Sequence, residues 1–227
     1  MRNGESGVRE TPCPAASGPS GVSGPPDAVG PPDAAGAGAG LRIACILGGQ
    51  EEPDCRPPAV AHWLGELAGD RGDLTLRVVD LADYDLPLRY PAHPTEEMAA
   101  FTAELAWAEG FVVVTPECNR SFPAQLKHAI DTGYDEWHAK PVGFVSYGFG
   151  CDGVRAVEHL RSVFTELHTV TVRDSVGIDL RFTDEKFPAG GSLYSDGLVR
   201  AAGALLDQLT WWGLALREAR ATRPYVA

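Results

Sequence analysis

The chain has 227 residues, a formal net charge of −12 and no apolar run near the roughly 18 residues needed to span a bilayer. The acidic balance argues against a nucleic-acid partner, because a phosphate backbone requires a basic binding face. The five cysteines are odd in number, widely spaced and form no Cys-x-x-Cys pair, which favours a reducing, cytoplasmic setting over a disulfide framework.

Residues 1–40 differ in composition from the rest of the chain. Gly, Pro, Ala and Ser dominate them, a near-repeat reads GPPDAVGPPDAAG, and no aromatic residue occurs. Such a segment cannot bury enough apolar surface to offset its backbone entropy, so we predict a disordered tail. It also lacks the apolar core of a secretory signal. Residues 41–227 are long enough for one compact domain.

Short apolar runs alternate with segments of helical spacing along this domain. Gly110 is expected to stop the second helix, and Pro123 fits the first turn of the third, where its missing N–H costs little. The regular alternation predicts an α/β fold, a doubly wound five-stranded parallel sheet with helices on both faces. The strands are predicted at 41–47, 75–81, 111–116, 141–148 and 170–180, and the helices at 59–69, 98–110, 122–134, 153–168 and 198–220.

Ligands of such sheets bind outside the carboxyl ends of the strands, near the topological switch point. This rule directs attention to the loops 48–58, 115–121 and 146–153. The last of them contains three glycines, which can take positive φ and bring N–H groups close to a ligand. In the middle loop, Asn119 or Ser121 is expected either to cap the next helix or to leave its N–H groups for a planar ligand.

Other polar and aromatic residues have ordinary structural explanations. Lys127 and His128 are interpreted as surface residues of the third helix. His62 and His159 have no partner close in sequence and are not nominated for catalysis. Trp211 and Trp212 are expected to pack against the core or a subunit interface.

Two long stretches carry a family resemblance. TPECNRSFPAQLKHAID, residues 115–131, is close to the pattern TPEYN-x-S-P-x-x-LK-x-AID, and AKPVGFVSYGFGCDGVRAVEHLR, residues 139–161, is close to KPVGFVSYGG followed by GG-x-RA and LR. In these motifs the chain resembles the NAD(P)H-dependent FMN reductases of the flavodoxin-like fold. The resemblance covers roughly residues 41–220 and identifies 41–227 as a flavodoxin-like FMN reductase domain.

The resemblance implies FMN at the strand ends and NAD(P)H as electron donor. Hydride would pass through the flavin to a small organic acceptor (a quinone, azo or nitro compound, or a pathway intermediate) or to free flavin. No side-chain acid or base is implied, and members are commonly homodimers or homotetramers. The residues expected at the cofactor are Gly48, Gly49, Gln50, Arg56, Pro116, Glu117, Cys118, Asn119, Ser121, Ser146, Tyr147, Gly148, Phe149, Gly150 and Gly153, with no metal.

The first loop departs from the family pattern, which has GS-x-R and further small and basic residues around the FMN phosphate. Here it reads GGQEEPDCRPP, so Glu51, Glu52 and Asp54 stand where a dianion is expected, and only Arg56 compensates. Like charges at 4 Å repel by about 1 kcal/mol in water, and by more in a drier site. The acidic loop therefore predicts weakened binding of FMN.

The other departures also fall in the ligand loops. Cys118 replaces the usual Tyr, Phe149 replaces a second Gly, and Cys151-Asp152 replaces small residues. With Cys55, these cysteines place one thiol in each loop. They are interpreted as small neutral fillers, and the alternative is a nucleophile or a metal site, for which the sulfurs must lie within about 4 Å of one another.

The favoured function is therefore an FMN-dependent oxidoreductase. The alternative is a flavodoxin-like protein that has lost FMN and uses the same crevice for another small ligand, with non-redox chemistry at the cysteines. A binding or regulatory module without catalysis is a third possibility. The sequence does not distinguish NADH from NADPH or identify the acceptor.

Overall fold

The computed structural model describes residues 40–49, 56–181 and 195–226. The predicted tail, apart from Gly40, lies outside these residues. The strands are β1 (Leu41–Leu47), β2 (Leu74–Asp80), β3 (Gly110–Pro116), β4 (Pro141–Gly148), β5 (Val170–Thr171) and β6 (Val176–Asp179). The helices are α1 (Arg56–Gly69), α2 (Glu96–Trp107), α3 (Ala124–Thr132), α4 (Val154–Glu166) and α5 (Asp196–Thr222), with single 3-10 turns at Leu81–Asp83 and Asp135–Trp137.

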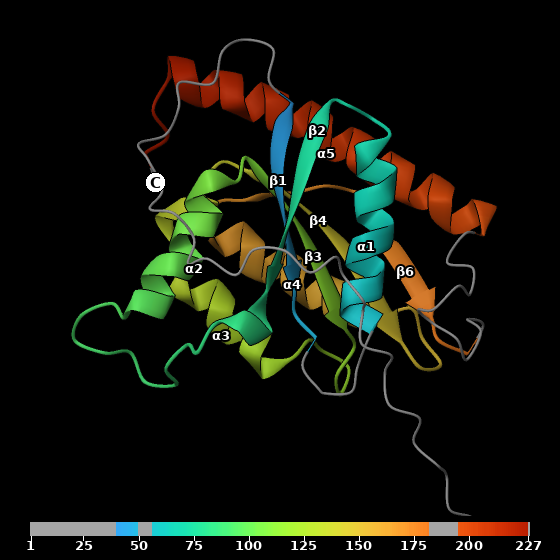
Figure 1. The fold of residues 1–227 in the computed structure, drawn as a ribbon, viewed down its shortest axis with the longest axis horizontal. Helices are drawn as coiled ribbons and strands as arrows, with labels where there is room; N and C mark the ends of the chain where they lie inside the picture. Colours follow the sequence, from blue (N-terminus) through green and yellow to red (C-terminus); the bar gives the residue numbers. More distant parts are fainter. Residues whose placement is uncertain (1–39, 50–55, 182–194, 227) are drawn as a thin grey trace, which may run out of the picture.

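The predicted parallel sheet is confirmed. Its strand order is β2-β1-β3-β4-β5, and β6 also pairs with β4. Every pairing is parallel, as expected when helices connect the strands (Figure 1). The chain moves from β1 to one side of the sheet and then from β3 to the other, so the switch point lies between β1 and β3. No helix in the described ranges is long and apolar enough to cross a membrane.

The fifth predicted strand, 170–180, is divided into β5 and β6. Four residues separate Thr171 from Val176, whereas two separate their β4 partners, Val142 and Val145. The extra residues bulge away from the sheet, and Arg161 of α4 donates hydrogen bonds to the carbonyls of Val172 and Arg173. Bulges of this kind re-aim the strand that follows. Here that strand is β6, which leads to the ligand edge.

The predicted helix limits differ from the observed ones by up to three residues, and two of these differences have a physical cause in the packing. Helix α2 ends at Trp107 rather than at Gly110, which instead begins β3. A side chain at Gly110 would meet Ile43 Cδ1 at 2.9 Å, so this glycine serves close packing in the sheet. Helix α3 begins at Ala124 after Pro123, without a side-chain cap, so neither Asn119 nor Ser121 caps it.

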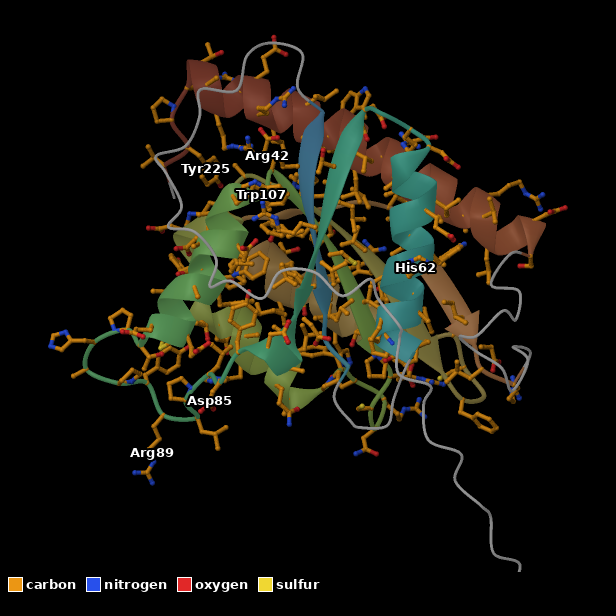
Figure 2. All side chains as sticks on the ribbon, viewed as in Figure 1. Arg42, His62, Asp85, Arg89, Trp107 and Tyr225 are labelled. Carbon is orange, nitrogen blue, oxygen red and sulfur yellow. The ribbon has the colours of Figure 1, made fainter. Side chains whose placement is uncertain are left out.

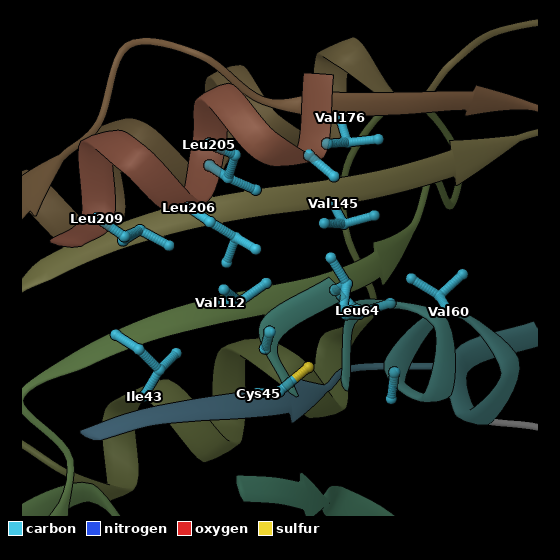
Figure 3. Close-up of a cluster of buried hydrophobic side chains, with 14 of the residues drawn as sticks. Ile43, Cys45, Val60, Leu64, Val112, Val145, Val176, Leu205, Leu206 and Leu209 are labelled. Carbon is cyan, nitrogen blue, oxygen red and sulfur yellow. The ribbon is translucent and has the colours of Figure 1, made fainter. Parts of the chain in front are cut away.

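The helices cover the two faces of the sheet and create two apolar clusters. Helices α1 and α5 pack on one face, where Leu205, Leu206 and Leu209 of α5 meet the strands (Figure 3). Helices α2, α3 and α4 pack on the other. Strands β3 and β4 are buried along nearly their whole length because both faces are covered. This burial fixes where their loops emerge.

Basic side chains gather where α2 and α5 end, at the amino-terminal edge of the sheet. The Lys140 ammonium donates to the carbonyl of Leu105 at 2.8 Å, and Arg220 donates to the carbonyl of Ala139. Burial, and then the charge of Arg220, lowers the pKa of Lys140 from 10.5 to about 7. Cations at helix C-termini offset the helix dipole. Figure 2 shows Arg42 and Trp107 near this edge, and Asp85 and Arg89 toward the opposite end.

Candidate functional site

The segments that follow β1, β3, β4 and β6 are tied together at the carboxyl end of the sheet. The Gly48 N–H donates to the carbonyl of Val114 at 2.8 Å, and the Glu117 N–H to that of Tyr147 at 2.8 Å. The Leu180 N–H donates to the carbonyl of Gly148 at 2.9 Å. These bonds continue the strand ladders beyond the strands, so the predicted loops do share one edge.

Gly48 and Gly49 begin the first loop in tightly packed surroundings. A Cβ at Gly48 would lie 2.8 Å from Leu126 Cδ2, and one at Gly49 would lie 2.4 Å from Pro57 Cγ and 2.7 Å from the Tyr147 hydroxyl. Only glycine therefore fits at Gly49 without displacing its neighbours. The remaining predicted features of this loop, Gln50, the three carboxylates at 51–54 and Cys55, lie outside the described residues, as does the side chain of Arg56.

The middle loop is a tight turn rather than a helix cap. Cys118 and Ser121 exchange main-chain hydrogen bonds of 2.8 and 2.9 Å, and between them Asn119 and Arg120 have φ of 48° and 67°. Two successive positive φ values are typical of type I′ turns, which favour Asn at the first position and Gly at the second. Arginine at the second position is strained. The turn projects the exposed Cys118, Asn119 and Arg120 at the strand ends.

Glu117 joins the middle loop to helix α4. Its carboxylate accepts from the Arg155 guanidinium at 2.7 Å and from the Arg155 main-chain N–H at 3.3 Å. The Glu117 side chain is only 6% exposed, and that of Arg155 is 41% exposed. Burial opposes ionisation of Glu117, but the hydrogen bonds and charge of Arg155 outweigh it, so the pKa of Glu117 lies below 4.5. This carboxylate is therefore ionised and already paired, and it positions the loop.

A second contact from the same helix holds the end of the turn. Ser121 Oγ lies 3.0 Å from His159 Nδ1. Arg155 and His159 are four residues apart, so they lie on one face of α4. The middle loop is thus fastened to α4 at both of its ends, through Glu117 and Ser121.

The third loop is anchored from β4 and β6. The Ser146 hydroxyl donates to the carbonyl of Asp152 at 2.7 Å, and the Gly150 N–H donates to Asp179 Oδ1 at 3.2 Å. Gly150 and Gly153 have φ of 81° and 78°, values that side chains other than glycine seldom adopt. A Cβ at Gly153 would also lie 2.6 Å from Ser146 Cβ. The glycines predicted from the sequence are therefore required by this backbone.

Asp179 is itself held by a neighbouring arginine. Its carboxylate pairs with the Arg181 guanidinium at 2.7 Å. The hydrogen bond from Arg181 lowers the pKa of Asp179 to about 2. The acceptor of the Gly150 N–H consequently remains charged at any physiological pH.

The amino-terminal ends of two helices face this edge with different capping. The first main-chain N–H groups of α4 are taken by Asp152 Oδ1, 3.3 Å from Val154 N, and by Glu117. Helix α3 begins without a side-chain cap. Main-chain N–H groups and a positive helix end suit an anionic or hydrogen-bond-accepting edge of a ligand. The glycine-bounded loops and this helix end fit the ring of a flavin, whereas the phosphate loop falls outside the described residues.

The cysteines do not form a metal site in the described ranges, where no group of three or more His, Cys, Asp or Glu side chains is placed to hold an ion. Cys45 is fully buried in β1, and burial raises its pKa to about 12. Cys118 is exposed, whereas Cys151 is partly buried. A Cβ added at Gly148 would lie 2.5 Å from Cys151 Sγ. Cys151 is thus closely packed, and a hydrogen bond from its side chain also helps to lower the pKa of Glu117.

Sequence reasoning missed four residues that shape this site: Arg155, His159, Asp179 and Arg181. Arg155 falls in the GG-x-RA motif, which could have drawn attention to it. Ser121 and His159 are 38 residues apart, as are Glu117 and Arg155, and no local pattern predicts such pairs. Asp179 and Arg181 lie after the bulge, which the sequence did not indicate.

Comparison with known proteins identifies the family. The sequence model of the NADPH-dependent FMN reductases matches residues 41–182. An NAD(P)H-dependent FMN reductase of Schizosaccharomyces pombe is 36% identical over 100 residues, 40% of this chain and 50% of that one. A 2-hydroxy-1,4-benzoquinone reductase of a Burkholderia species is 28% identical over 179 residues, 76% of this chain and 96% of that one. The chain thus spans about half of the first relative and nearly all of the second.

A solved structure shares the fold. The flavoenzyme FerB of Paracoccus denitrificans, an NAD(P)H:(acceptor) oxidoreductase, superposes with a TM-score of 0.65 at 20% identity, over 77% of this chain and 98% of that one. The predicted flavodoxin-like architecture is therefore confirmed. On the match of the family model over most of the described domain, the chain belongs to the NADPH-dependent FMN reductase family.

Proposed function

We propose that this protein is an FMN-dependent oxidoreductase that passes hydride from NAD(P)H to a small organic acceptor, with quinones and free flavin as the first candidates. The observation that carries the proposal is the set of three loops held together at one sheet edge, in a chain of this family. The names of the two curated relatives, an FMN reductase and a benzoquinone reductase, support the same acceptor classes.

The described loops supply the parts that such a cofactor needs. Gly48 and Gly49 fix the start of the first loop by close packing. Residues 116–121 would offer one wall for the ring, and residues 146–153 would offer main-chain groups at its edge. FMN, when bound, would supply the group that accepts hydride from the nicotinamide and returns it to an acceptor. The chain's own residues would bind and orient the cofactor and the acceptor.

The electrostatics of the described edge suit this role. An uncompensated carboxylate beside a ring that gains negative charge would oppose its reduction. The buried carboxylate at this edge, Glu117, is paired with Arg155, and Asp179 is paired with Arg181. Both pairs therefore place cations near the loops without leaving either acid alone.

We also propose that the protein is a homodimer or homotetramer in the cytoplasm. Trp211 and Trp212 of α5 are 65% and 38% exposed, so they do not pack into the core as one alternative expected. Their rings contact each other edge to face at 4.9 Å and present an apolar surface. Subunit contact on this face of α5 accounts for that exposure. Sedimentation velocity on wild type and Trp211→Glu tests this, since a monomeric wild type contradicts it.

Steady-state oxidation of NADH and NADPH, with and without added FMN and with menadione as acceptor, tests the proposed activity. The proposal requires FMN-dependent turnover that menadione accelerates. A protein that binds FMN but shows no turnover with either nicotinamide would contradict the activity while leaving the cofactor. A protein that binds neither FMN nor a nicotinamide supports the alternative of a crevice adapted to another ligand.

A further inference from the structure

Phe149 is the most exposed Phe, Tyr or Trp side chain in the described part of the chain. Its side chain is 81% exposed, on the loop between β4 and α4. An uncovered phenyl ring gains nothing from its contact with water. Ligand sites are lined mainly by hydrophobic and aromatic side chains, and Phe149 lies at the carboxyl ends of the strands, where ligands of such sheets bind.

The loop holds this ring in place by its neighbours on both sides. Gly148 cannot carry a side chain, because a Cβ there would meet Cys151 Sγ at 2.5 Å. Gly150 has φ of 81°, and its N–H is bonded to Asp179. Asp179 in turn is fixed by Arg181 at 2.7 Å. The phenyl ring is therefore exposed although the backbone on both sides of it is held in place.

The position of the loop indicates what covers the ring. Gly148 lies at the end of β4, directly beside the β3 loop, where the Glu117 N–H bonds to the carbonyl of Tyr147. We propose that Phe149 provides an aromatic wall for a planar ring bound at this edge of the sheet. This inference rests on the proposed function, from which the ring is either the isoalloxazine of FMN or a planar acceptor such as a quinone.

Two substitutions test the wall directly. Phe149→Leu keeps an apolar side chain but removes the flat ring, and Phe149→Trp keeps a flat ring. The matched control is Tyr134→Leu, which removes an exposed aromatic ring after α3, at the opposite end of the sheet. The quantities measured are the FMN dissociation constant by titration, and the KM for menadione and for ferricyanide, which has no ring.

The two sources of the ring give different results. If the wall faces FMN, Phe149→Leu raises the FMN dissociation constant about 3- to 10-fold, the range expected for one lost aromatic contact. If it faces the acceptor, FMN binding is retained and the KM for menadione rises by a similar factor, with that for ferricyanide unchanged. In either case Phe149→Trp retains wild-type values and Tyr134→Leu has no effect.

The inference is overturned if Phe149→Leu leaves FMN binding and the menadione KM unchanged, or if Phe149→Trp is as impaired as Phe149→Leu. Its failure differs from failure of the proposed function, because wild type would still bind FMN and turn over. If wild type binds no FMN, the proposed function falls. Menadione binding to wild type and Phe149→Leu by equilibrium dialysis then decides the role of Phe149, and equal or absent binding overturns it.

Discussion

Glu117, at the end of β3, accepts hydrogen bonds from both the guanidinium and the main-chain N–H of Arg155, at 2.7 and 3.3 Å. One acidic side chain thereby pairs a cation, caps helix α4 and fixes the direction of the middle loop. Because the same loop is fastened again through Ser121 and His159, its geometry is set before any ligand arrives. Preorganised loops of this kind reduce the cost of ordering on binding.

Replacing Glu117 with Gln tests this relationship. The amide keeps an acceptor for the Arg155 N–H but loses the charge, so we expect a lower urea midpoint and weaker FMN binding, by about threefold or more as the loop loosens. The matched control is Asp131→Asn, which breaks the exposed Lys127–Asp131 pair of α3. Exposed pairs of this spacing contribute about 0.3–0.5 kcal/mol. Equal effects in the two variants would contradict the role given to Glu117.

The effect of Glu117→Gln on stability should depend on pH in the acidic range. The pKa of Glu117 is lowered in the folded protein, so its contribution to stability is present above the ordinary value of 4.5 and is lost as pH falls through the lowered value. The stability difference between wild type and Glu117→Gln should therefore shrink as pH falls below 4.5. Urea unfolding from pH 7 downward measures it, and a constant difference would count against the pair.

The strained turn predicts a stabilising substitution. Arg120 has φ of 67°, a conformation that costs a side-chain-bearing residue roughly 1–2 kcal/mol and glycine nothing. Arg120→Gly is expected to raise the free energy of unfolding by about 1 kcal/mol after the entropy of glycine is subtracted. Arg89→Gly is the control, since Arg89 is exposed but has no positive φ and should lose stability. Urea unfolding of both variants measures the change in stability. Destabilisation by Arg120→Gly would contradict the strained conformation of Arg120.

Two glycines near α1 give opposite predictions. Gly49→Ala places a Cβ 2.4 Å from Pro57 Cγ, so it should cost about 1–3 kcal/mol and weaken FMN binding. Gly65→Ala, within α1, meets nothing within 4 Å and should stabilise by about 0.5–1 kcal/mol. Thermal unfolding and FMN titration of the two variants measure both effects. Tolerance of alanine at Gly49 would show that the first loop is not packed as described.

Lys140 makes stability depend on alkaline pH. Because its pKa is lowered from 10.5 to about 7, the unfolded chain binds a proton that the folded chain does not hold between these values. The free energy of unfolding is therefore not reduced by Lys140 above pH 10.5, and it falls progressively as pH falls from 10.5 to about 7. Lys140→Met should flatten this dependence. Urea midpoints from pH 7 to 10 test it, and parallel profiles would contradict it.

Much of the fold was predictable because buried strands are short apolar runs. FVVV before Thr115 and the run at 141–148 are covered on both faces, and their predicted limits are within one residue of those observed. Parallel strands place their following loops at one edge, so the gathering of residues 115–121 and 146–153 also followed. Gly150 and Gly153 were singled out correctly, since positive φ there requires glycine.

The remainder depended on contacts between residues far apart in sequence. Glu117 was expected at the cofactor, which stays a prediction, and its carboxylate is bonded to Arg155, a partner that no periodicity reveals. Capping by Asn119 or Ser121 was one of two alternatives, because both types cap well, yet the main-chain bonds of the 118–121 turn prevailed. The bulge before β6 is supported by Arg161, which a one-dimensional strand pattern cannot indicate.

Titration of the purified wild-type protein with FMN, followed by visible absorption and fluorescence, is the measurement on which the proposed function depends most. We expect saturable binding at one FMN per chain, weakened in Gly49→Ala and in Glu117→Gln but retained in Gly65→Ala. A protein that stays colourless and leaves the FMN spectrum unchanged at all concentrations would contradict it. The loops at the strand ends would then serve another ligand.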